Sequence, residues 1–157
     1  MWWATLCTVL IFPLGIVVDT PAHAERAGPW EPTVTLTADG TNAVSRGDLA
    51  VDRAGWVVAV WYDAADSGVW AAVRPAGQAW EAAERIGDAS ARPRSGTPDP
   101  QVGIDGAGTA TVLWPGGGED ERVLVARQAR KGAWTAPVAV SGPAPNTTPR
   151  CRLAADS

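Results

Sequence analysis

The chain has 157 residues, with 13 Lys and Arg against 17 Asp and Glu and a formal net charge of −4 at pH 7. Neither sign dominates, and the sequence contains no basic patch for nucleic acid and no polybasic run for an anionic membrane surface. The single histidine, His23, lies in a segment that we expect to be removed. A mature chain without histidine excludes His-based catalytic triads and most zinc sites.

Residues 1–24 are typical of a secretory signal peptide. An apolar stretch, Trp2–Val18, is followed by the small residues Ala22 and Ala24, which predict cleavage after Ala24. The stretch is shorter than the roughly 20 residues of a membrane-spanning helix, so a retained anchor is the less favoured alternative. The segment departs from the usual pattern because it contains no Lys or Arg. We therefore expect a secreted, extracellular protein.

The two cysteines have different expected fates. Cys7 would leave with the signal peptide, and the residues before it lack the small side chain expected ahead of a lipidated cysteine, so a lipoprotein is not predicted. Cys151 would remain alone in the mature chain. An unpaired cysteine in an exported protein indicates either a partner elsewhere or a buried free thiol, and the sequence leaves both open.

A motif in residues 51–55 returns 53 residues later in residues 104–108, and each copy is followed by a tryptophan six residues after its Gly. A second block, 69–72, returns in residues 123–126, again with a tryptophan downstream. Self-similarity at a fixed period of about 50 residues is typical of stacked supersecondary units. The structural repeat positions are Asp52, Gly55, Trp61 and Trp80 in the first unit and Asp105, Gly108, Trp114 and Trp134 in the second.

Each unit divides into four short apolar runs separated by turn residues, which predicts four antiparallel strands. The expected strands are 49–51, 56–61, 69–73 and 80–86 in the first unit, and 102–104, 109–114, 123–127 and 134–140 in the second. The Asp-x-x-Gly sequence after the first run predicts a hairpin, because Asp bonds the backbone two residues on and Gly permits a positive φ. Alternate residues on both faces are apolar, so we expect each sheet to be covered on both sides.

Stacked four-stranded sheets of this kind predict an all-β fold of β-propeller blades, with about two complete blades and partial flanking strands. The expected organisation is a signal peptide (1–24), the last strand of a preceding blade with a linker (25–44), a first full blade (45–98), a second full blade (99–142), and a linker with the first strand of a truncated next blade (143–157). Closed propellers use about 4 to 8 blades. We therefore expect the ring to be closed by further blades of a longer chain or by a homo-oligomer.

The pattern Val/Ile-Asp-x-x-Gly, a strand ending in Trp, Val-x-x-Ala and a final Trp resembles the repeat of secreted actinobacterial β-propeller proteins grouped with the sialidase-like or BNR-repeat propellers. The likeness covers residues 30–156. The sialidase Asp-box differs in carrying Ser or Thr two positions before Asp and one residue fewer before Gly than in 52–55. The resemblance implies blade architecture, and the Asp-box of that family is itself structural.

Two sets of residues are candidates for ligand binding. Trp56 and Trp70 stand where the other copy of the repeat has Thr and Leu, so the repeat does not require an indole there. They are the candidates for a surface contact with a glycan. Carboxylates gather in the loop after the second strand of each unit, where they could bind Ca²⁺ or belong to a solvated loop. The candidate ligands are Asp63, Asp66, Glu119, Asp120 and Glu121.

No catalytic residue is predicted. Cleavage by a sialidase-like mechanism would need a tyrosine nucleophile, and the sole tyrosine, Tyr62, follows a strand tryptophan and is better explained by packing. We therefore expect a binding or surface-interaction module whose partner is a glycan or cell-surface ligand. The alternative is the N-terminal part of a sialidase-like glycoside hydrolase whose catalytic residues lie mainly in other blades.

Overall fold

The computed structural model of the chain describes residues 31–37, 44–89, 99–116, 121–143 and 153. The expectations for the signal peptide, Glu119, Asp120 and Cys151 concern residues outside these ranges. Contacts divide the chain into Met1–Thr33 and Val34–Ser157, and all the strands belong to the second unit. Across the described ranges, no helix has the length and apolar character needed to cross a membrane.

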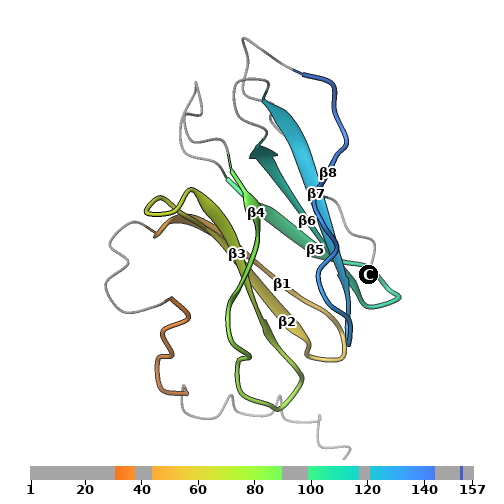
Figure 1. The fold of residues 1–157 in the computed structure, drawn as a ribbon. Helices are drawn as coiled ribbons and strands as arrows, with labels where there is room; N and C mark the ends of the chain where they lie inside the picture. Colours follow the sequence, from red (N-terminus) through yellow and green to blue (C-terminus); the bar gives the residue numbers. More distant parts are fainter. Residues whose placement is uncertain (1–30, 38–43, 90–98, 117–120, 144–152, 154–157) are drawn as a thin grey trace, which may run out of the picture. The chain divides into compact units, whose positions relative to one another are not determined.

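Across the described residues, eight strands form two four-stranded antiparallel sheets (Figure 1). The first sheet contains β1 (Val44–Val51), β2 (Val57–Asp63), β3 (Gly68–Arg74) and β4 (Glu84–Asp88). The second contains β5 (Gln101–Ile104), β6 (Thr109–Gly116), β7 (Arg122–Ala129) and β8 (Val138–Ala139). Strands adjacent in sequence are adjacent in each sheet, and the described residues contain no helix. The prediction of an all-β chain built from four-stranded antiparallel units is therefore confirmed.

The first hairpin of each sheet is closed by the same turn. The Oδ1 atom of Asp52 accepts hydrogen bonds from the amides two and four residues later, at 2.8 and 2.9 Å. Asp105 accepts the equivalent bonds at 3.0 and 2.8 Å. Gly55 and Gly108 have φ values of 80° and 78°, which an L-residue adopts only with strain. The Asp-x-x-Gly motif thus folds as its sequence predicts, because the carboxylate replaces the missing backbone partners of the turn.

The fourth strand of each sheet begins later than the sequence predicts. Trp80 and Trp134 precede β4 and β8, and each is followed by a residue whose amide bonds the neighbouring strand at 2.8 Å, to the carbonyls of Val73 and Arg127. Pairing then lapses before the ladder starts. In the second sheet Pro137 has no N–H to donate, and β8 contains only two residues. Both tryptophans therefore lie in extended connections to an edge strand.

The two sheets pack face to face through one continuous core. We call the face of the first sheet that carries Val58, Val60 and Ala71 its rear face, and these side chains are at most 1 % exposed. The facing surface of the second sheet carries Val112 and Trp114, both 0 % exposed, and we call it a front face. Residues of both surfaces belong to the same buried cluster. Each Å² of apolar surface that this contact removes from water contributes about 25 cal/mol to the packing of the sheets.

Trp114 of the second sheet contacts the end of β4 in the first sheet. Its Nε1 donates a hydrogen bond of 2.9 Å to the carbonyl oxygen of Asp88 at the end of β4. The ring lies against Gly87, where an added Cβ would come within 2.5 Å of the indole. A tryptophan that is both fully buried and hydrogen-bonded combines a large apolar contact with a satisfied polar group.

The interface joins two different faces of the repeating unit. The first sheet uses its rear face and the second sheet uses its front face, so the front face of the first sheet and the rear face of the second have no sheet packed on them within the described residues. On the open front face, Leu49 and Val51 are 55 % and 58 % exposed. Their counterparts in the second unit, Val102 and Ile104, are buried at 8 % and 5 %. These two repeat positions are therefore core in the second sheet and surface in the first, whereas Val57 and Trp61 of the same front face are each only 6 % exposed.

The rear faces show the converse difference. Ile86 of the first sheet is 5 % exposed in the shared core, whereas its counterpart Val140 is 61 % exposed. The amide of Val140 bonds the carbonyl of Val123, which lies on the rear face of the second sheet beside Leu113 and Val125. These side chains leave an apolar rear face that matches the one covered in the first sheet.

Candidate functional site

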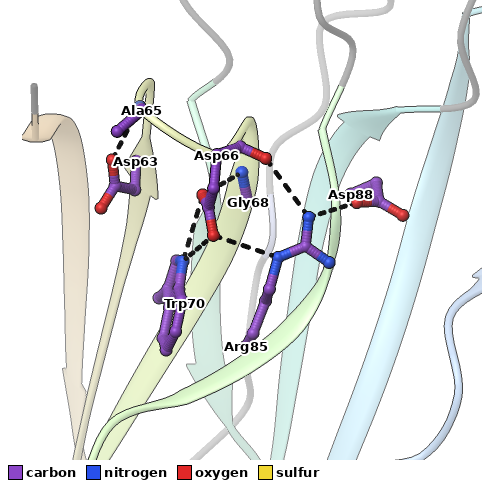
Figure 2. Close-up of polar contacts among 7 residues, drawn as sticks. All are labelled: Asp63, Ala65, Asp66, Gly68, Trp70, Arg85 and Asp88. Carbon is purple, nitrogen blue, oxygen red and sulfur yellow. Dashed lines mark hydrogen bonds and ion pairs between the residues drawn. The ribbon is translucent and has the colours of Figure 1, made fainter.

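The loop between β2 and β3 is held by an ionic cluster on the first sheet (Figure 2). Asp66 accepts hydrogen bonds from the Gly68 amide at 2.8 Å, from Trp70 Nε1 at 3.2 Å and from Arg85 Nε at 3.2 Å. Arg85 also forms an ion pair with Asp88, and this hydrogen bond raises the pKa of the guanidinium against the opposing effect of burial. These ion pairs are partly exposed, so they contribute little to the free energy of unfolding. Their main effect is to order the loop.

The structure describes three of the acidic residues that the sequence groups as candidate Ca²⁺ ligands. Asp66 is paired with Arg85, while Asp63 is 6 % exposed and accepts a bond of 2.9 Å from the Ala65 amide. Glu121 is 3 % exposed at the start of β7. Among the described residues, no group of three or more His, Cys, Asp or Glu side chains is arranged to hold a metal ion. A Ca²⁺ site that includes Glu119 and Asp120 stays a prediction.

The two candidate glycan-binding tryptophans lie in different environments. Trp70 is half-buried on the open front face, in register with Trp61. Its indole nitrogen is already bonded to Asp66. Trp56 is 1 % exposed and belongs to the core, so the expectation that it lies on the surface is wrong. Its position immediately after the 52–55 turn brings the ring under the second sheet, which a repeat comparison alone does not reveal.

The candidate tyrosine of the hydrolase alternative is also buried. Tyr62 is 6 % exposed and belongs to the rear-face core with Val69. A nucleophile has to reach a substrate, and an enclosed phenol in an apolar cluster does not meet that need. The structural role that the sequence favours for this residue agrees with its place.

A cavity of about 420 Å³ lies where the two sheets meet, beside the 52–56 turn. Its buried wall includes Trp56, Val73 and Gln128. Its outer parts come from the β3–β4 and β7–β8 connections, with the charged residues Glu81, Glu84, Arg130 and Lys131. This volume falls within the roughly 300–1,000 Å³ of typical small-ligand pockets.

Arg130 joins the two sheets at the edge of this cavity. Its guanidinium forms an ion pair with Asp52 and lies 5.8 Å from the centre of the Trp56 ring. Burial raises the pKa of Asp52, but the bonds from the Trp56 and Ala54 amides and the charge of Arg130 outweigh it, so the pKa lies below its ordinary value. Asp52 is therefore ionised at neutral pH and fixes Arg130 over the indole.

Two of the residues that line the cavity each carry a polar atom that is enclosed within the protein and has no hydrogen-bond partner. These atoms are Nε1 of Trp56 and Oε1 of Gln128, on side chains that are 1 % and 7 % exposed. Gln128 donates from Nε2 to the Gly132 carbonyl at 2.9 Å, which orients the amide group. Gln128 and Arg130 are not among the candidate residues that the sequence indicates. The available signal was that both depart from the repeat, whose other copy has Arg74 and Ala76 at those positions.

No protein-family model matches the chain, and no curated protein is significantly similar to it.

Proposed function

We propose that the chain supplies stacked blades of a secreted β-propeller that serves as a binding module. A stacking unit must present one surface to the unit before it and a different surface to the unit after it. The front and rear faces meet this requirement, because one junction between them is already formed within the chain. Contacts that join two different faces generate rings when the rotation closes.

The observation that carries the proposal is a hydrogen bond that recurs with the repeat. At the junction of the two sheets, Asp48 of β1 accepts a bond of 3.0 Å from the Val102 amide in β5. Gln101 occupies the place of Asp48 one repeat later, and its Oε1 accepts a bond of 2.8 Å from the Leu153 amide. Residues 153–156 resemble the start of the repeat at 49–52. Leu153 thus donates to the second sheet the same hydrogen bond that Val102 donates to the first.

The open faces supply the reason for association. Burying Leu49 and Val51 as Val102 and Ile104 are buried would remove four-carbon and three-carbon side chains from water, each contributing roughly 1.5–3 kcal/mol. The rear face gains in the same way through Val140, which corresponds to the buried Ile86. The occupant that fits these faces is another unit of the same repeat. A binding role is favoured because the described residues offer a cavity of about 420 Å³ with polar and apolar lining at the junction of the sheets.

The proposal is tested by the mass of the chain in solution. The wild-type chain is expected to associate, as measured by size-exclusion chromatography with light scattering. Val51→Lys on the front face and Val140→Lys on the rear face should each reduce association, because the ammonium group would have to be buried at the junction. Val34→Lys is the control, since Val34 is equally exposed at 60 % but precedes the sheets. A wild-type chain that melts cooperatively as a monomer would overturn the proposal.

A further inference from the structure

We infer that the two open faces of the chain fit other units of the repeat better than they fit each other. The inference rests on the proposed stacking and names the preferred partner. That partner is a unit of different sequence, with Gly where this chain has Ser141 on its rear face or Asp63 on its front face. Both residues stand where the junction inside the chain has glycine. A second copy of the chain is therefore the poorer partner.

Gly87 provides the room for a tryptophan at the junction inside the chain. A Cβ on Gly87 would lie 2.5 Å from Cζ2 of Trp114, whose side chain is fully buried. Carbon atoms do not approach this closely, and a close-packed core leaves the ring little space in which to move. The bond from Trp114 to the Asp88 carbonyl holds the ring in the same place. The junction therefore requires a residue without a side chain at position 87.

Ser141 is the counterpart of Gly87 on the open rear face. Gly87 pairs with Val69 in the first sheet. An offset of 54 residues relates Val69 to Val123, and it also relates Gly87 to Ser141. The second sheet keeps this pairing, because the Val123 amide donates a hydrogen bond of 2.9 Å to Ser141 Oγ. Ser141 thus brings a Cβ and a hydroxyl group to a place where the formed junction has only a hydrogen atom.

The hydroxyl group of Ser141 also contacts the next carbonyl. It donates a hydrogen bond of 3.0 Å to the carbonyl oxygen of Gly142, which is the counterpart of Asp88. In the formed junction the Asp88 carbonyl accepts from Trp114, whose counterpart in the first unit is Trp61. A second copy that docked in the same way would place the Trp61 ring against the Ser141 side chain. Its indole N–H would also compete with the hydroxyl group for the Gly142 carbonyl.

Asp63 creates a second mismatch, on the front face. Its counterpart in the formed junction is Gly116, where an added Cβ would lie 2.8 Å from the carbonyl oxygen of Asp88. In a junction between copies, the Asp63 side chain would face the Gly142 carbonyl. An ionised carboxylate and a carbonyl are both acceptors, so no hydrogen bond can join them. Contacts of this kind give an interface specificity, because they weaken the binding of one partner relative to another.

The test compares variants of the full chain by sedimentation equilibrium. Ser141→Gly should lower the dissociation constant of self-association at least about tenfold, because it removes the Cβ that overpacks the junction. Ser141→Ala is the matched control. It loses the same hydrogen bond from Val123 but keeps the Cβ, so it should show only a small part of this gain. Asp63→Asn keeps an acceptor for the Ala65 amide and supplies a donor for the opposing carbonyl, so it should also strengthen association.

Val51→Lys combined with Ser141→Gly should abolish the gain, since the altered rear face must still meet an open front face. Association of wild type that Ser141→Gly does not strengthen, or an equal gain in Ser141→Ala, would overturn the inference and leave the proposed stacking intact. Absence of association in wild type and in every variant would overturn both. A monomeric wild type that associates after Ser141→Gly would support the inference, while it would overturn the expected association of the natural chain with itself.

Discussion

Asp52 and Asp105 fill the same place in two copies of one turn but have different surroundings. Both carboxylates accept hydrogen bonds from the amides two and four residues later. Asp52 additionally forms the ion pair with Arg130, which belongs to the other sheet, and its side chain is 9 % exposed in that pair. The repeat thus forms the same turn twice. Among the described residues, the carboxylate of the first copy also forms an ion pair between the two sheets, beside the cavity.

This difference predicts unequal effects of the same substitution. Asp105→Ala removes two hydrogen bonds in an exposed turn and should lower the free energy of unfolding by about 1 kcal/mol. Asp52→Ala also leaves Arg130 without this partner and should lower it by about 2–3 kcal/mol. Asn keeps an acceptor oxygen, so Asp105→Asn should hardly change the free energy of unfolding. Asp52→Asn should still lower it, by less than Asp52→Ala does, because the ion pair with Arg130 is lost. Urea denaturation of the four variants measures these differences, and equal losses at the two positions would contradict the role of Arg130.

The pH dependence of stability tests whether Asp52 acts through its charge. Its pKa is lower in the folded chain than the ordinary value of 3.8, so its contribution to stability is complete above that pH and is lost as pH falls through the folded value. The stability difference between wild type and Asp52→Asn should therefore be constant near neutral pH and shrink below about pH 4. A difference that persists unchanged in acid would show that the carboxylate acts through shape and not through charge.

At the scale of the strands, the alternation of apolar residues predicted the central strands closely. The expected run 56–61 is observed as β2, Val57–Asp63, because the Asp turn fixes where the strand begins. The last strands were predicted to begin too early, because hydrophobicity does not report which amides find a ladder partner. The burial of Trp56 could not be predicted either. A departure from the repeat shows that a residue is not needed for the blade, but its contacts depend on the neighbouring sheet.

The fit of β4 against the second sheet allows a test at this scale. Gly87→Ala would place a Cβ 2.5 Å from the ring of the buried Trp114, so the sheets would have to separate locally. We expect a loss of about 1–3 kcal/mol in the free energy of unfolding. Gly106→Ala is the control, because no atom lies within 4 Å of the added Cβ there, and it should change stability by less than about 0.5 kcal/mol. Equal melting temperatures for the two variants would contradict the close packing of the sheets.

For the whole molecule, the sequence predicted the repeat, and the structure adds the direction of stacking. Periodicity alone indicates that units resemble one another, but it does not say which face of one unit meets which face of the next. The burial of Ile104 beside the exposure of Val51 supplies that information. In the proposed assembly, a contact of front to rear would leave one face of each kind open after every addition, so units would extend in one direction until a ring or a stack formed.

Front-to-rear contact makes a specific prediction for mixtures of two variants, each with a charged residue on one of the two faces. Val51→Lys should prevent association through the front face and leave the rear face able to associate. Val140→Lys should prevent association through the rear face and leave the front face able to associate. Each variant alone has only one kind of face and should remain monomeric. An equimolar mixture should form a 1:1 heterodimer, because the open rear face of one variant meets the open front face of the other. Light scattering with one partner fused to a larger tag identifies the pair. If contacts instead joined identical faces, each variant would dimerise alone through its unblocked face, and mixing would produce no preference for the heterodimer.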